Sequence, residues 1–172
     1  MPNAAFRSAL FMVGAAFAVA CSNSSTAPTA SAAVVSFAPQ GGATGFSPSG
    51  TITVVFSDSM MAGMEAYMSL HRDSLKGPLV PMTGHWSSDH KTLTMTSNAP
   101  LLSGTTYYIH MGGGMKDANG ATINYGACHG LGGQSATSTM MGGTMGGMSG
   151  EMGTGWMGTD GNYGMVFSFT TA

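Results

Sequence analysis

Seven short runs rich in β-branched and aromatic residues restrict most strongly how this chain can fold. They are residues 34–37, 51–56, 67–71, 80–86, 92–96, 105–111 and 165–170. Gly, Pro, Ser and Asn separate the runs, and no stretch sustains the period of a helix. Several short strands with frequent turns are typical of two antiparallel sheets packed face to face. The sequence therefore predicts an all-β, two-sheet sandwich of about seven strands.

Alternation within the runs predicts which side chains face the interior. Successive side chains on a strand point to opposite faces, so Leu93 and Met95 face inward between threonines. In the same way Tyr107, Ile109 and Met111 face inward, while Tyr108 and His110 face outward. Phe167 and Phe169 are expected to close the core from the last strand.

The amino terminus predicts export. Residues 1–20 combine one basic residue, Arg7, with a short apolar run and small residues before Cys21. Such a run is too short to span a membrane and is typical of a secretory signal peptide. The ending Ala-Val-Ala-Cys resembles the lipobox of bacterial lipoproteins, whose cysteine is lipidated after cleavage. The alternative is an ordinary signal peptide cut near Ala20, which leaves Cys21 as a plain thiol.

A tether, a domain and an insertion are expected after the signal peptide. Residues 21–32 are small, polar and uncharged, a composition that favours a flexible, lipid-anchored tether. Residues 33–172 form one domain, interrupted by an insertion at residues 124–162. Beyond the leader, four basic residues face seven carboxylates, a net charge of −3. Without a basic patch, nucleic acid is not expected as a partner. The membrane is the expected partner, through the lipid on Cys21.

Six segments in order resemble a known family. They are PQGGATGFSP at 39–48, ITVVFSDSM at 52–60, KTLTMT at 91–96, APLLSGTTY at 99–107, KDANG at 116–120 and FSFTT at 167–171. Together they resemble the bacterial Ig-like domain of the type named after the S-layer protein SbsA. The resemblance implies an immunoglobulin-like sandwich on a secreted or surface protein, with no catalytic residues.

The predicted insertion before the last strand departs from that family and concentrates methionine. Its methionines are separated mainly by Gly, Ser and Thr, which cannot build a hydrophobic core. Thioethers are soft ligands suited to Cu(I). The candidate metal ligands in this segment are Met140, Met141, Met145, Met148, Met152, Met157, Cys128 and His129. The alternative is a low-complexity expansion with no function, in which Cys128 is a thiol without a role.

Other methionines are expected to be structural. Met60, Met95, Met111 and Met115 fall at inward positions, where methionine fills gaps in a core. Met61, Met64 and Met68 have the spacing that would put three thioethers on one side of a short helix. A turn that faces the core gives the same pattern, so both interpretations stay open.

Histidines form a second candidate set. His71 and His110 fall on the third and sixth predicted strands, which are neighbours in Ig-like sandwiches, so both are expected on one outer face. His85 is also expected to point outward, and His90 to be a solvated turn residue. Imidazole suits Cu(II) and Zn(II), so exposed His71, His85 and His110 are candidate ligands beside the thioethers.

Catalytic patterns are missing from the sequence. There is no Gly-x-Ser-x-Gly motif, and Gly112–Gly114 is not followed by a helical pattern, as a phosphate-binding loop requires. The chain is expected not to be an enzyme. Two hypotheses remain. One is an envelope lipoprotein, periplasmic or surface-facing, that binds copper, with Cu(I) favoured, or silver, and exchanges it with copper-handling proteins. The other is an Ig-like surface or adhesion module whose methionines are filler or an oxidant sink.

Overall fold

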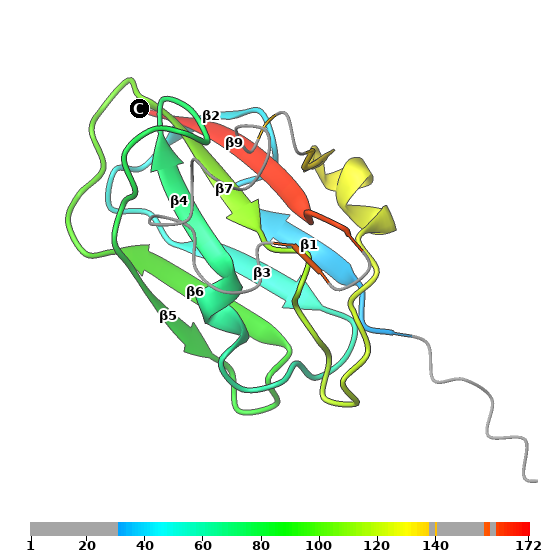
Figure 1. Cartoon of the computed structure of the whole chain (residues 1–172). Helices are drawn as coiled ribbons and strands as arrows, with labels where there is room; N and C mark the ends of the chain where they lie inside the picture. The colour runs from blue at the N-terminus through cyan, green and yellow to red at the C-terminus, as the bar shows by residue number, and fades with distance from the viewer. Residues whose placement is uncertain (1–30, 138–139, 141–156, 159–160) are drawn as a thin grey trace, which may run out of the picture.

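The computed structural model describes residues 31–137, 140, 157–158 and 161–172, which form two packed sheets (Figure 1). The strands are β1 (Val34–Ala38), β2 (Ala43–Phe46), β3 (Ile52–Phe56), β4 (Met68–Arg72), β5 (Met82–Trp86), β6 (Thr92–Ser97), β7 (Thr106–Met111), β8 (Gln134–Ser135) and β9 (Met165–Thr171). Two short 3-10 helices, η1 (Met64–Tyr67) and η2 (Gly126–Leu131), lie in connections. The C-terminus lies at the opposite end of the sandwich from the start of β1 (Figure 1).

The strand order confirms the predicted sandwich. One sheet has the order β1-β3-β6-β5, and the other has the order β2-β9-β7-β4, with β8 also paired to β9. Each of the seven predicted runs overlaps a strand, within one or two residues at either end. The additional strands β2 and β8 were not predicted, because β2 contains a glycine and lacks alternation and β8 has only two residues. Within each sheet the pairs are antiparallel, except that β2 runs parallel to β9.

The core lies between the two sheets, as the alternation predicts. Val54, Leu93 and Ile109 are fully buried, and the rings of Phe37 and Phe167 stack with centroids 3.8 Å apart. All seven side chains predicted to face inward are buried: Leu93, Met95, Tyr107, Ile109, Met111, Phe167 and Phe169. Burial of large apolar side chains is the main favourable contribution to such a fold.

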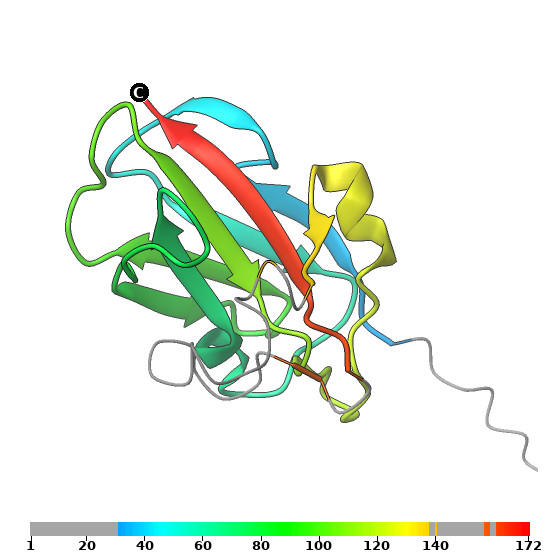
Figure 2. The same ribbon diagram turned by 45° about the horizontal axis from the view of Figure 1, so that its top comes forward.

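The first part of the predicted insertion is built into the sandwich. Tyr125 and Cys128 belong to the main core, and β8 pairs with Val166 and Met165 of β9. Figure 2 shows η2 and β8, in yellow and orange, beside the start of red β9. Residues 124–137, the first part of the insertion expected at 124–162, thus pack on the sandwich, with Tyr125 and Cys128 in its core. Residues 141–156 lie outside the described part of the chain.

The structure settles the methionines of the sandwich. Met60, Met95, Met111 and Met115 are buried, which confirms their predicted packing role. Met64 and Met68 are buried as well, and the Met64 Sδ accepts a hydrogen bond from the Lys116 N–H at 3.2 Å. Met61 is exposed and precedes η1. The core-facing interpretation therefore holds for two of these three residues, and they do not form one thioether surface.

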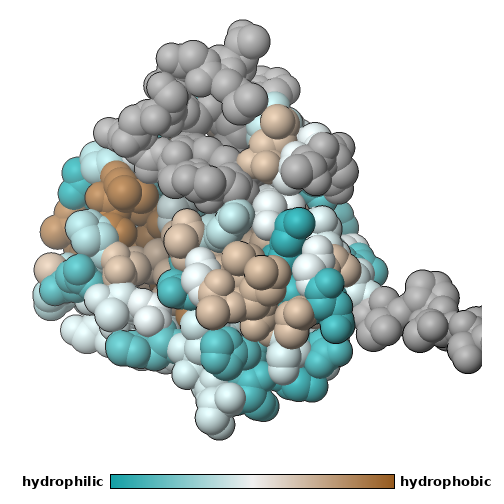
Figure 3. Space-filling model, turned by 60° about the horizontal axis from the view of Figure 1, so that its bottom comes forward, coloured by the Kyte–Doolittle hydropathy of each residue, from teal (hydrophilic) through white to brown (hydrophobic). Residues whose placement is uncertain are grey.

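Exposed apolar side chains are spread over several elements. Val35, Met61, Leu79 and Leu102 are the exposed large apolar residues of the sandwich. The end of the molecule in Figure 3 shows hydrophobic residues in groups among hydrophilic ones. No helix among the described residues is long and apolar enough to cross a membrane. The leader, Cys21 and the tether up to residue 30 lie outside those residues.

Candidate metal-binding site

Two histidines lie side by side on the outer face of the sheet that contains β4, β7 and β9. In the β4–β7 register Ser69 is opposite His110, and His71 is opposite Tyr108. Because side chains alternate along a strand, His71 and His110 project from the same face and are diagonal neighbours. The predicted strand adjacency and shared outer face are confirmed.

Both histidines are buried, although exposure was expected. His71 is 1% exposed and His110 is 0% exposed. A small second core of Leu75, Ala136 and Val166, with Tyr108 and Tyr163 packed against it, lies on this face. Leu75 comes from the β4–β5 connection, and Ala136 and Tyr163 flank the methionine-rich segment. Alternation predicts only the face of a sheet, and these connections cover the face from solvent.

Hydrogen bonds fix the proton on each ring. The His71 Nδ1 lies 3.2 Å from the Gly77 carbonyl oxygen, and its Nε2 lies 3.2 Å from the Ser69 Oγ. The His110 Nε2 bonds the Tyr163 carbonyl oxygen. A carbonyl only accepts, so His71 carries its proton on Nδ1 and His110 on Nε2. The unprotonated nitrogens of the neutral rings are therefore His71 Nε2 and His110 Nδ1.

Burial keeps His110 neutral. Desolvation disfavours the charged imidazolium and lowers the pKa of His110 from 6.5 to about 3. The hydrogen bond to the Tyr163 carbonyl acts in the opposite direction, and the neighbouring His71 adds to the lowering. The ring is thus a neutral base throughout the physiological range.

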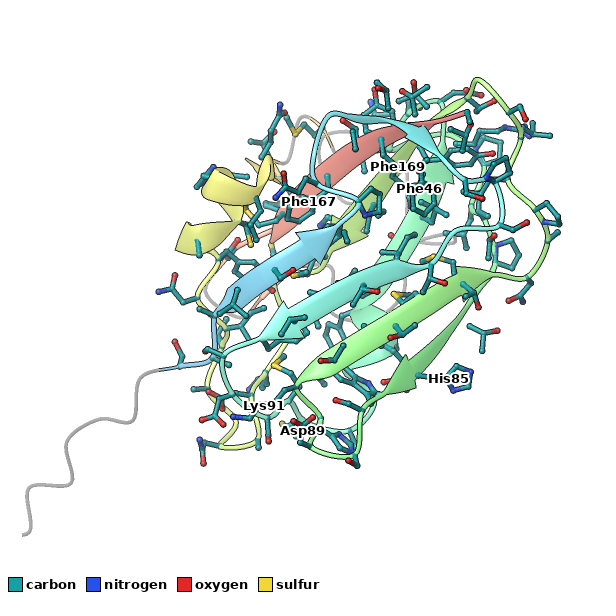
Figure 4. The ribbon with its side chains drawn as sticks, turned by 180° about the vertical axis from the view of Figure 1, so that it is seen from behind. Phe46, His85, Asp89, Lys91, Phe167 and Phe169 are labelled. Carbon is teal, nitrogen blue, oxygen red and sulfur yellow. The ribbon has the colours of Figure 1, made fainter. Side chains whose placement is uncertain are left out.

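His85 lies elsewhere. It is on β5 in the other sheet, where it is exposed and projects away from the sandwich (Figure 4). The proposed grouping of His71, His85 and His110 is therefore wrong, because the third histidine belongs to the opposite outer face. His90 is half-buried in the β5–β6 turn and stacks on Trp86 with ring centroids 6.1 Å apart, so it is not the solvated residue expected.

Cys128 and His129 are adjacent in η2 but lie in different environments. Cys128 is 0% exposed in the main core, and burial raises the pKa of its thiol to about 11. His129 is exposed, and its Nε2 lies 3.3 Å from the Ser135 Oγ. A buried, protonated thiol is a poor ligand, because metals bind the thiolate. Cys128, predicted as a ligand together with the methionines, thus packs in the main core, where burial disfavours the thiolate.

The methionine-rich segment leaves and rejoins the sandwich at one place. The Ala136 N–H donates to the Gly164 carbonyl oxygen at 2.9 Å, next to the β8–β9 pairing. Met140 and Met157 are 37% and 36% exposed. The other four predicted thioether ligands, Met141, Met145, Met148 and Met152, lie outside the described residues.

A polar cavity of about 460 Å³ opens beside the joined ends of the methionine-rich segment. Asn124, His129, Ser135 and Asn162 are among the residues that line it. Sequence reasoning identified only His129 of these, since a short strand and an asparagine in a glycine-rich connection give no pattern. Gly77 and Tyr163, which contact the buried histidines, lie in connections and were missed for the same reason. Among the described residues, no three or more His, Cys, Asp or Glu side chains converge as a metal site.

Comparisons with known proteins give a family and distant structural likenesses. Among curated proteins, none matches the chain significantly. A structure of surface layer protein SbsC, domains 1–6, is 19% identical with a TM-score of 0.41, over 57% of this chain and 13% of that chain. A second SbsC structure is 19% identical with a TM-score of 0.40, over 54% and 12%. CopC from Methylosinus trichosporium OB3b is 13% identical with a TM-score of 0.37, over 55% and 95%.

Similarity at this level transfers no property of those proteins, and the chain spans only about an eighth of the SbsC structures. The family match is of another kind. The model of the bacterial Ig-like domain matches residues 25–129, which is more than half of the chain. Its matched region contains β1 to β7 and most of η2. This protein therefore belongs to the family of bacterial Ig-like domains.

Proposed function

We propose that this protein is an exported bacterial lipoprotein of the cell envelope that binds soft metal ions through its methionine-rich segment. Cu(I) is the favoured ion and Ag(I) the second. Lipid on Cys21 holds the Ig-like domain at the membrane, with the domain periplasmic or surface-facing. The protein sequesters the ion or exchanges it with copper-handling proteins of the envelope. We expect no catalytic activity from an Ig-like domain of this family.

One observation carries the proposal. Six methionines fall between residues 140 and 157, in a segment whose two ends are joined by the Ala136–Gly164 hydrogen bond. The methionines described within the sandwich are buried or half-buried, apart from Met61. By contrast, Met140 and Met157 are exposed. Core packing therefore explains the methionines of the sandwich but not these two.

Thioether chemistry favours a monovalent soft ion. Methionine sulfur is neutral and polarisable, and it selects Cu(I) over harder divalent ions. A thioether has no proton to lose in the working pH range, so binding does not compete with protonation. An acid-resistant Cu(I) site is the expected property of the segment.

A titration of the purified protein with Cu(I) under anaerobic conditions tests the proposal. The variant carries leucine at Met140, Met141, Met145, Met148 and Met152, a change that keeps side-chain volume. We expect it to bind fewer Cu(I) ions than wild type at pH 5, because the thioether ligands are gone, while circular dichroism shows an unchanged fold. A matched control replaces the buried Met95 and Met115, which should leave Cu(I) binding intact. Equal Cu(I) binding by the leucine variant and wild type would exclude the segment as the site.

Membership of a non-catalytic Ig-like family supports a second candidate function. In it the domain is a surface or adhesion module, and the exposed methionines are filler or a sacrificial sink for oxidants. This candidate predicts methionine sulfoxide in the segment after peroxide treatment but no retained Cu(I). It takes over if the leucine variant binds Cu(I) as wild type does.

The anchor is tested separately. Lipidated protein should partition into detergent, and Cys21→Ala should release it to the soluble fraction or block processing. A wild-type protein found wholly in the soluble fraction would contradict the lipid anchor and leave metal binding untouched.

A further inference from the structure

The two buried histidines, His71 and His110, are neighbours on one covered face of the sheet. Ser69 lies opposite His110 across the β4–β7 pair, and the His71 Nε2 lies 3.2 Å from the Ser69 Oγ. The ring of His71 is therefore directed along β4 toward the position opposite His110. The two buried imidazoles are therefore diagonal neighbours on one face of the sheet.

Each ring is oriented as metal-bound histidines usually are. A metal-ligating histidine generally donates its second ring N–H to a carbonyl or carboxylate, which fixes the tautomer and the direction of the lone pair. Here the Gly77 carbonyl holds the His71 Nδ1–H, and the Tyr163 carbonyl holds the His110 Nε2–H. These two carbonyls belong to different connections, yet each orients one ring.

The surroundings determine which ion fits. The pair lies under Leu75, Ala136 and Tyr163, and no carboxylate or cysteine joins it among the described residues. The desolvation cost of an ion in a poorly polarisable site rises steeply with its charge, and no negative group here offsets that cost. A divalent ion is therefore disfavoured relative to a monovalent ion, and imidazole is a suitable ligand for copper.

We propose that His71 Nε2 and His110 Nδ1 together bind one monovalent soft cation, Cu(I) or Ag(I), beneath the second core. The site shares the chemistry of the proposed function but does not require the methionine-rich segment. The Ser69 hydroxyl, which donates to His71 Nε2 in the metal-free protein, turns away when the ion binds. Leu75, Ala136 and Tyr163 cover the pair and must separate to admit the ion. Binding here is therefore slower than at exposed thioethers.

The test uses Ag(I), which is redox-inert and diamagnetic, with the full chain in detergent and the five loop methionines changed to leucine. Native mass spectrometry gives the stoichiometry, and ¹H–¹⁵N NMR of the histidine rings identifies the ligating atoms. We expect one bound Ag(I), with shifts at His71 Nε2 and His110 Nδ1, while both N–H nitrogens keep their protons. His85→Ala is the matched control and should not change binding.

His110→Gln should weaken Ag(I) binding strongly. Loss of a supporting partner alone costs about 10- to 100-fold in affinity, and loss of a ligand should cost at least as much. If this variant fails to fold, the ring shifts in the folded methionine variant still decide the question. Zn(II) is the second probe and should bind at least tenfold more weakly than Ag(I), which corresponds to about 1.4 kcal/mol.

The outcomes separate the two proposals. If the methionine variant binds no Ag(I), or binds it without shifts at these two nitrogens, the pair is purely structural and only orients its two connections. If Zn(II) binds more tightly than Ag(I), the assignment of a monovalent ion is wrong. Loss of Cu(I) from the methionine segment in the wild-type background bears on the proposed function and not on this site.

Discussion

The two outer faces of the sandwich follow the same sequence pattern and have opposite environments. On the β3-β6-β5 side, Thr83, His85 and Thr96 alternate with core residues and lie exposed. On the β4-β7-β9 side, His71 and His110 also alternate with core residues but are buried. The difference comes from the connections, because Leu75, Ala136 and Tyr163 cover only the second face.

This difference shows what places a polar residue in a functional environment. A strand period determines the face of a side chain, but only the packing of connections determines its solvation. His85 therefore remains an ordinary surface histidine. His110, in the same alternation, is held neutral in an apolar setting with a pKa of about 3. The covered face is the one with unusual chemistry.

The largest expected effect comes from removing the residues that cover the outer face of the β4-β7-β9 sheet. Replacing residues 127–161 by a short Gly-Ser linker removes Cys128 and Ala136 from their packing and β8 from its pairing with β9. We expect a loss of about 3 kcal/mol or more in the free energy of unfolding, or a fall of about 10 °C in Tm. Replacing only residues 141–156 is the control and should change Tm little, since loop-closure entropy varies slowly with length. Equal melting temperatures for the two variants would contradict the packing role of residues 127–137.

A smaller loss is expected from the covered face itself. In metal-free protein, His110→Ala leaves a cavity and removes the hydrogen bond to the Tyr163 carbonyl. We expect a cost of about 2–4 kcal/mol in the free energy of unfolding, measured by urea denaturation. A cost below about 0.5 kcal/mol would mean that the cover does not pack on this ring.

Acid should lower the free energy of unfolding because the His110 side chain binds a proton more readily in the unfolded chain than in the folded one. The folded pKa is about 3 and the ordinary value is 6.5, so between these values the unfolded chain binds a proton that the folded chain excludes. The free energy of unfolding is therefore complete above pH 6.5 and falls as the pH drops toward 3, by at most about 1.4 kcal/mol per unit. Urea midpoints measured from pH 7 to pH 4 test this in metal-free protein. His110→Gln should flatten the slope, and an unchanged slope would assign it to other groups.

The smallest change in stability is expected on the exposed outer face of the β3-β6-β5 sheet. His85 is exposed, so His85→Ala is expected to shift the free energy of unfolding by no more than about 0.5 kcal/mol. Urea denaturation at pH 7 measures this directly beside His110→Ala. A comparable loss in both variants would remove the distinction between the two faces.

The β-branched runs predicted the sandwich well, because alternation and turn residues are local signals. They placed Leu93, Ile109 and Phe167 in the core and His71 beside His110 on neighbouring strands. The burial of those histidines was not predictable, since it depends on Leu75 and Ala136, which are distant in sequence and belong to no periodic pattern. Similarly, Cys128 in a glycine-rich stretch gave no sign that it packs in the main core.

The pairing along the edge of β9 affects whether copies of this protein can associate through their sheets. β8 pairs with Met165 and Val166, and β2 pairs opposite Phe169 and Thr171, so two short strands share one edge. At the other end of the sheet, residues 78–80 return beside β4, where the Val80 N–H donates to the Leu70 carbonyl oxygen. Unpaired strand edges are templates for intermolecular sheet growth. Both margins of this sheet end in short segments, which disfavours fibrillar self-association of concentrated protein through this sheet.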